Sequence, residues 1–126
     1  HRVVQFFRGR EIHTEAIYGD VDQKERAQFI SEFQGGQLRV LVIQPQAASH
    51  GITLTAANTI VWFSLLPSNE VHQQANHRII RIGQTRGQLV IYLIGSPAER
   101  RLFKQLSIKQ DFSAETLESF RELIIE

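Results

Sequence analysis

The sequence predicts an α/β protein built around a mostly parallel sheet. Short, almost wholly apolar runs, which are typical of buried parallel strands, alternate with segments that have the apolar periodicity of helices. With 126 residues, of which 42% are hydrophobic and 21% charged, the chain is expected to form one packed domain or part of one. Ligands of such sheets are expected outside the carboxyl ends of the strands.

The first half of the chain is expected to hold two helices and two strands. Apolar residues at helical spacing predict a helix at the start of the chain that ends at Gly9. The β-formers of residues 12–18 predict a strand. Asp22 is a suitable N-cap for a helix that ends at Gly35, and the apolar run over 38–43 predicts a strand buried on both faces.

The second half continues this alternation and ends in an acidic segment. Its expected elements are a strand over 59–63, a helix from Ser68 or Asn69 to Ile79 or Ile80, a strand over 89–94, a helix from the capping box Ser96-Pro97-Ala98-Glu99 to about Lys109, and a C-terminal acidic helix within 111–126.

Composition excludes several classes of protein. The chain has no cysteine, which rules out a disulfide scaffold, a thiolate metal site and a cysteine nucleophile. No apolar run approaches the roughly 20 residues of a membrane span, and the first residues lack the apolar stretch of a secretory signal. We therefore expect an intracellular domain.

The charges are unevenly distributed although the net charge is only +1. Residues 78–101 hold five arginines and one acidic residue, whereas residues 111–126 hold five acidic residues and one arginine. A local arginine cluster in a nearly neutral chain indicates phosphate chemistry at one place rather than general polyanion binding.

Several catalytic motifs are missing from the sequence. It contains no Gly-Lys-Ser/Thr loop for ATP phosphates, no G-x-G-x-x-G and no G-x-S-x-G. His72 and His77 would lie about 140° apart around a helix, which does not suit a shared metal, so no metal site is expected. The histidines are expected at the surface or in loops.

Gln74, Arg78 and Arg81 are spaced i, i+4 and i+7, which would place them on one face of a helix. Guanidinium groups bind phosphate oxygens bidentately and remain charged at any working pH, so this face suits a polyphosphate. The alternative from spacing alone is a solvated helix face with extended arginines.

The segment from Gln74 to Gln84, with the pattern Q-A-x-x-R-x-x-R-I-G-Q, resembles motif VI of superfamily 2 helicases in the form typical of the Swi/Snf family of ATP-dependent DNA translocases. Residues 47–58 resemble motif V, and the resemblance extends over roughly residues 10–105. Further matches are Gly19, Arg26, Ile30 and Phe33 upstream, and residues 90–94 and 97–101 downstream.

This resemblance implies a RecA-like three-layer sandwich with helices on both faces of the sheet, and it implies that the chain is the second, C-terminal lobe of a motor. In the family, ATP and magnesium are held mainly by a first RecA-like lobe, which supplies the phosphate loop. The first strand of the second lobe is expected to lie outside this chain. The implied partners are the first lobe of the same polypeptide and double-stranded DNA, and the chain alone is expected to be inactive.

The resemblance also assigns roles to individual residues. Arg78 and Arg81 would be arginine fingers that reach the γ-phosphate, and Gln74 would help to order the phosphate and the attacking water. Gly51 would allow the backbone to approach the nucleotide or DNA phosphates closely. Possible contacts to the DNA backbone, for which ordinary turn hydrogen bonding is the alternative, are Gln46, Ser49 and Thr53.

The chain departs from the family at Ser64, where many members have aspartate, and at residues 66–68, which lack the usual tryptophan. These changes resemble shorter bacterial and phage members, which would place the protein in the cytoplasm; a eukaryotic member would be nuclear. Two other functions stay open: a non-catalytic DNA- or protein-binding module with a RecA-like fold, and a free-standing flavodoxin-like ligand-binding protein. Trp62 is expected to pack in the core rather than to stack on a base.

Overall fold

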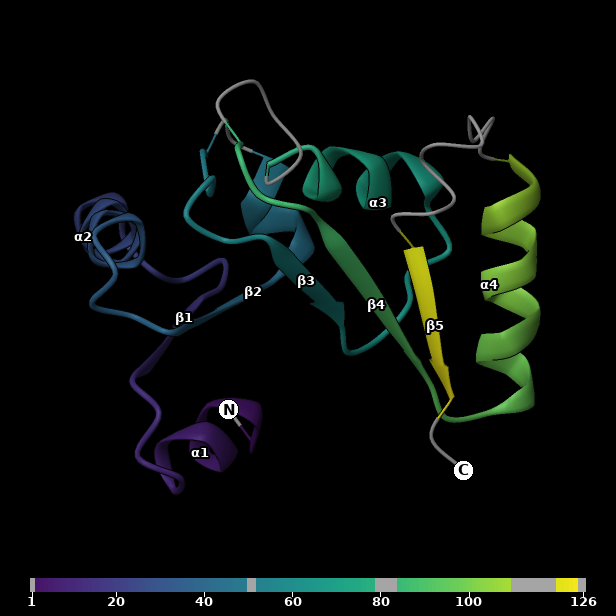
Figure 1. Cartoon of the computed structure of the whole chain (residues 1–126), viewed down its shortest axis with the longest axis horizontal. Coiled ribbons are helices and arrows are strands. Elements are labelled where there is room, and N and C mark those ends of the chain that lie inside the picture. The colour runs from purple at the N-terminus through teal and green to yellow at the C-terminus, as the bar shows by residue number, and fades with distance from the viewer. Residues whose placement is uncertain (1, 50–51, 79–83, 110–119, 125–126) are drawn as a thin grey trace.

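The computed structural model of the chain describes residues 2–49, 52–78, 84–109 and 120–124. Helices and strands alternate along the chain, as predicted (Figure 1). In chain order the elements are α1 (Arg2–Arg8), β1 (Thr14–Ile17), α2 (Gln23–Gln34), β2 (Val40–Ile43), the 3₁₀ helix η1 (Pro45–Ser49), β3 (Thr59–Trp62), α3 (Asn69–Asn76), β4 (Leu89–Ile94), α4 (Pro97–Lys109) and β5 (Phe120–Ile124).

All strand pairs in the described part of the chain are parallel. They form two sheets, β1-β2 and β3-β4-β5, where the sequence predicted one. Because β2 and β3 are not paired with each other, each is an edge of its sheet. The four residues of β2 are accordingly only half-buried, so the expectation that this strand is buried on both faces is wrong.

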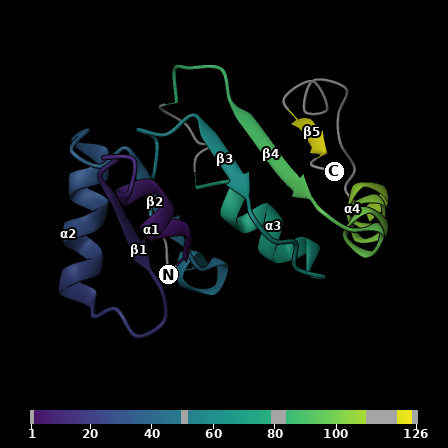
Figure 2. The same cartoon turned by 90° about the horizontal axis from the view of Figure 1, so that it is seen from below.

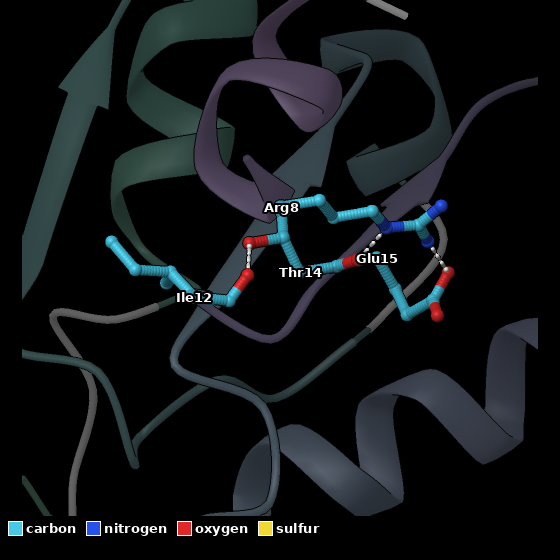
Figure 3. Close-up of polar contacts among 4 residues, drawn as sticks. All are labelled: Arg8, Ile12, Thr14 and Glu15. Carbon is cyan, nitrogen blue, oxygen red and sulfur yellow. Dashed lines mark hydrogen bonds and ion pairs between the residues drawn. The ribbon is translucent and has the colours of Figure 1, made fainter. Parts of the chain in front are cut away.

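Helix α1 is joined to β1 by polar contacts (Figure 3). Arg8 donates from Nε to the carbonyl of Thr14 at 3.1 Å and from Nη2 to Oε2 of Glu15 at 3.0 Å. The hydroxyl of the fully buried Thr14 donates to the carbonyl of Ile12 at 2.9 Å. These contacts join the end of the helix to the start of the strand.

Helix α2 begins and ends as the sequence predicts. Asp22 accepts a hydrogen bond from the backbone N–H of Glu25 at 2.9 Å, which satisfies one of the free donors of the first turn. At the other end Gly36 has φ +83°, and the N–H groups of Gly36 and Gln37 donate to the carbonyls of Phe33 and Glu32. This is the Schellman arrangement, which needs a residue in the left-handed region and therefore favours glycine.

In the described part of the chain, two clusters of buried side chains contribute to the core. One contains the buried Ile52 and Leu54 with half-buried side chains of α2, β2 and β3 around them. The other lies on β3 and β4 and contains Trp62, Val90, Tyr92 and Ile94, with contributions from α3 and α4. Figures 1 and 2 show α3 beside β3 and β4, and α1 beside β1 of the other sheet.

The C-terminal part of the chain corrects one prediction. Helix α4 follows the expected capping box, with Ser96 Oγ accepting from the N–H of Glu99 at 3.2 Å. However, Phe120–Ile124 forms strand β5, parallel to β4, so the acidic helix expected within 111–126 is wrong over these residues. Pairing with the exposed edge of β4 provides backbone hydrogen bonds that override local helix propensity. Residues 111–119 and 125–126 of that prediction lie outside the described residues.

Candidate functional site

Helix α3 carries the first of the predicted site residues. Ser68 caps its start, accepting from the N–H of Val71 at 3.3 Å. The helix ends at Asn76, earlier than the expected Ile79 or Ile80, and Arg78 lies in the turn that follows, with its N–H donating to the carbonyl of Ala75 at 3.1 Å. Arg78 is thus not on a continuous helical face with Gln74. Arg81 lies outside the described residues.

A long-range backbone bond explains why the chain turns at Arg78. Its carbonyl accepts a hydrogen bond at 3.1 Å from the N–H of Leu54 in the loop before β3. The carbonyl therefore has a partner outside helix α3. The half-buried Arg78 joins motif VI to the segment that resembles motif V.

Gln74 is exposed, and its Nε2 donates to Oε1 of Glu70, one turn earlier on α3, at 3.1 Å. This bond on a solvated face is weak enough to exchange for a ligand contact. Gln74 therefore lies where a group approaching α3 from solvent could reach it.

The motif V loop, residues 52–58, is fixed by its apolar side chains. Ile52 and Leu54 are buried in the first core cluster, and a turn closes with the N–H of Ala57 donating to the carbonyl of Leu54 at 3.0 Å. Thr53, between the two buried residues, is exposed. The alternation buries the apolar residues and leaves the hydroxyl-bearing residue at the surface.

The 3₁₀ helix η1 packs against α3, which brings the start of motif V beside the helix of motif VI. Gln46 is exposed on η1. Ser49 is the last residue of η1, and Gly51 lies outside the described residues. The structure thus places the backbone of two of the three predicted DNA-contacting residues, Gln46 and Ser49, next to α3.

Side chains from two other parts of the chain hold the tip of the loop. Gln84 donates from Nε2 to the carbonyls of Thr55, at 3.1 Å, and Ala57, at 2.6 Å. From the other side, Gln34 at the end of α2 donates to Thr55 Oγ1 at 3.2 Å and accepts from the N–H of Ala56 at 2.8 Å. The guanidinium of Arg86 donates to the carbonyl of Ala56. We call Gln34, Gln84 and Arg86 the loop clamp.

The sequence indicated one member of the loop clamp in part and another not at all. Gln84 is the last residue of the motif VI pattern, but the pattern does not indicate which groups it contacts. Gln34 and the loop that it contacts are 21 and 22 residues apart, and no local pattern predicts such a contact.

Helix α3 runs antiparallel to β3. Its first half lies near the segment after β3, since His72 bonds to Leu66, and its end lies near Leu54, which precedes β3. Arg78 is therefore on the amino-terminal side of β3. The sequence predicted ligands beyond the carboxyl ends of the strands, and Arg78 does not lie at that end of β3.

A buried polar group lies beneath α3. His72 is fully buried, although the histidines were expected at the surface or in loops, and its ring lies 4.0 Å from that of Trp62. Its Nε2 is 2.9 Å from the carbonyl of Leu66. Burial lowers the pKa of His72 from its ordinary value, and the hydrogen bond with Leu66 opposes this in part. Burial of the ring thus disfavours its charged form.

Trp62 and Tyr92 complete this group. Trp62 is buried in the core, as predicted, and its Nε1–H donates to Oδ1 of Asn76 at 3.0 Å. The Nδ2 of Asn76 donates to the hydroxyl of Tyr92 at 3.4 Å. Burial raises the pKa of Tyr92, and the bond with Asn76 lowers it in part. Sequence reasoning did not single out Asn76.

Within the described residues no group of three or more histidine, cysteine, aspartate or glutamate side chains could hold a metal ion. A search of the same residues finds no helix that is both long and apolar enough to span a membrane.

The parallel strands with crossover helices define an α/β lobe in which motifs V and VI are neighbours. The chain belongs to the helicase conserved C-terminal domain family, whose pattern matches residues 1–84. The solved C-terminal part of the Fun30 ATPase domain has a similar fold, with a TM-score of 0.76 and 20% identity over 94% of this chain and 38% of that one. This likeness confirms the predicted RecA-like fold.

Two curated relatives are similar to this chain: one is named as SWI/SNF-related and the other as a DNA annealing helicase. The SWI/SNF-related matrix-associated actin-dependent regulator of chromatin subfamily A-like protein 1 of Drosophila melanogaster is 32% identical over 118 residues, covering 88% of this chain. The human DNA annealing helicase and endonuclease ZRANB3 is 32% identical over 110 residues, covering 86% of this chain. The chain spans only 16% and 10% of these relatives. Both are animal proteins and give no support for the expected bacterial or phage placement.

Proposed function

We propose that this chain is the second motor lobe of an ATP-dependent translocase or helicase that acts on double-stranded DNA. Its membership of the helicase C-terminal domain family and the Swi/Snf-type relatives support this role. ATP and magnesium are held mainly by a first RecA-like lobe of the same polypeptide, and the present lobe closes over them.

The observation that carries the proposal is the hydrogen bond from the Leu54 N–H to the Arg78 carbonyl. It joins the backbone of the loop proposed to follow DNA to the residue proposed to meet the nucleotide. Since η1 also packs against α3, the two motifs form one packed unit, which in the proposed mechanism moves with the lobe. A single rigid unit that touches both ligands is what a motor needs to convert closure over ATP into a step along DNA.

In the proposed chemistry, Arg78 and Arg81 stabilise the transferring γ-phosphoryl group. Charge accumulates on its equatorial oxygens in the transition state, and a positioned arginine is worth about 10³–10⁵ in rate. Gln74, exposed on α3, orders the phosphate and the attacking water. These three side chains act only when the first lobe brings the nucleotide to them.

The DNA contact of the proposal lies along η1 and the motif V loop. Gln46, Ser49 and Thr53 contribute polar groups, and Gly51 lets the backbone approach a phosphate closely. Uncharged donors of this kind bind phosphate oxygens without reading sequence, so translocation along any duplex is possible.

The test uses the protein that contains this chain together with its first lobe. Steady-state ATP hydrolysis is measured without nucleic acid and with saturating duplex DNA, single-stranded DNA or RNA. The proposal predicts that duplex DNA stimulates hydrolysis most. Hydrolysis that no nucleic acid stimulates, or that only RNA stimulates, would refute it. Binding to DNA or to a partner protein without hydrolysis would instead support the non-catalytic module.

A further inference from the structure

Asn76 occupies an unusual place, because it is a polar residue of α3 that faces the core. Its side chain lies between two aromatic residues of the sheet, accepting from the Trp62 indole N–H at 3.0 Å and donating to the Tyr92 hydroxyl at 3.4 Å. All three residues are buried. An indole N–H can only donate, whereas an amide has both an acceptor and a donor, so asparagine serves both partners at once.

The two partners lie on neighbouring strands of one sheet. Trp62 and Tyr92 lie opposite each other in the register of β3 and β4, and their rings are parallel within 4° at a centroid distance of 6.4 Å. Phe103 of α4 packs on Tyr92 from a centroid distance of 5.1 Å. The aromatic pair is therefore held by two strands and by α4, in addition to its contacts with α3.

Helix α3 touches this pair at two points that lie one turn apart. The ring of His72 contacts that of Trp62 at a centroid distance of 4.0 Å, tilted by 44°, and Asn76, four residues later, bonds to the same indole. Two contacts separated by one turn fix both the rotation of a helix about its axis and its shift along that axis. A buried hydrogen-bonding asparagine is a known means of setting helix register, at a cost in stability relative to an apolar side chain.

The orientation of α3 determines where the site residues lie. Gln74 is two positions before Asn76, which is about 200° around the helix, and it is exposed where Asn76 is buried. Arg78 is two positions after Asn76, in the turn that α3 leads into. We propose that Asn76, held between Trp62 and Tyr92, is a positioning residue that sets α3 so that Gln74 and Arg78 meet the nucleotide. This inference rests on the proposed function.

The test compares Asn76→Leu, which keeps the size of the side chain and removes its polar groups, with wild type in the protein that contains this chain. DNA-stimulated hydrolysis is resolved into kcat and KM for ATP. A misplacement of about 1 Å can cost up to about 100-fold in rate, so we expect kcat to fall at least about 10-fold. KM should stay within about 3-fold, because the nucleotide is held mainly by the other lobe.

Ile17→Val is the matched control, because Ile17 is fully buried in β1, in the other sheet. It removes buried apolar volume without touching α3 and should leave kcat unchanged, whatever its effect on the urea midpoint. A double-mutant cycle adds a second readout: Trp62→Phe should lower kcat alone but cost little more in the Asn76→Leu background, because both changes break the same bond. If Asn76→Leu does not fold, kcat is measured on Trp62→Phe alone, which breaks the same hydrogen bond.

The outcomes separate this inference from the proposed function. Loss of kcat in Asn76→Leu with normal kcat in Ile17→Val supports it. Normal kcat in Asn76→Leu and Trp62→Phe, while Arg78→Ala loses hydrolysis, overturns the positioning role and leaves the proposed function intact. Hydrolysis that persists in Arg78→Ala overturns the proposed function and this inference with it.

Discussion

Burial should decide how much each member of the loop clamp contributes to stability. Gln84 and Gln34 each make two hydrogen bonds to the tip of the motif V loop, but Gln84 is half-buried whereas Gln34 is exposed. In Gln84→Leu the carbonyls of Thr55 and Ala57 lose a donor in a partly dry environment. At about 0.5–1.5 kcal/mol for each bond, the free energy of unfolding should fall by about 1–3 kcal/mol.

Gln34→Leu is the matched comparison, because it removes two bonds to the same loop with the same change of side chain. Water can replace the lost partners at an exposed position, so we expect a change of no more than about 0.5 kcal/mol. Leucine and glutamine have similar helix propensities, which keeps the effect on the last turn of α2 small.

The assay is equilibrium unfolding in urea followed by tryptophan fluorescence. Trp62 is the chain's single tryptophan and is buried, so its emission reports the loss of the core. With a slope of about 1.5 kcal/mol per molar urea, the Gln84→Leu midpoint should fall by roughly 0.7–2 M, with the slope unchanged. Equal losses in the two variants, or a Gln84→Leu loss below about 0.5 kcal/mol, would refute the reasoning from burial.

Three further predictions concern protonation, hydrolysis and DNA. Burial lowers the pKa of His72, so below pH 6.5 the unfolded chain binds a proton more readily than the folded chain. The free energy of unfolding should therefore fall as pH drops below 6.5. Urea midpoints measured between pH 8 and 5 should fall more steeply in wild type than in His72→Gln. The chain alone should hydrolyse no ATP above background, and turnover that survives repurification and is lost in Arg81→Ala would contradict this. Duplex binding by the chain should be weak and insensitive to sequence, and fluorescence anisotropy should show it weakening from about 50 to 200 mM salt; a tight, sequence-specific, salt-insensitive complex would contradict it.

Local signals in the sequence predicted most of the fold. Capping residues such as Asp22 and Ser96, and the glycines after α2, act on the nearest turn of the chain, so their effect is visible in the sequence. The helix expected near the C-terminus failed because β5 depends on pairing with β4, about 30 residues away. The expectation that β2 is buried on both faces failed for a similar reason, since burial depends on neighbouring elements that a single apolar run does not reveal.

The sequence motifs predicted which residues belong to the candidate site but not the contacts that hold them in place. The resemblance identified Gln74, Arg78 and the motif V loop, and the structure brings the loop and Arg78 together through a backbone hydrogen bond. The loop clamp and the Trp62–Asn76–Tyr92 contacts join residues that are far apart in sequence. Glutamine, asparagine and aromatic side chains occur in most proteins, so no spacing rule indicates these contacts.

The measurement that tests the central claim most directly is DNA-stimulated ATP hydrolysis by Arg78→Ala and Arg81→Ala, beside nucleotide binding on the same preparations. Arginines that meet the γ-phosphate only on closure stabilise the transition state more than the ground state. Each variant should therefore lose most hydrolysis, with nucleotide affinity within a few-fold of wild type and DNA binding retained. Arg81→Lys should stay impaired, because lysine lacks the planar fork. Near-normal turnover in Arg81→Ala would contradict the arginine-finger assignment.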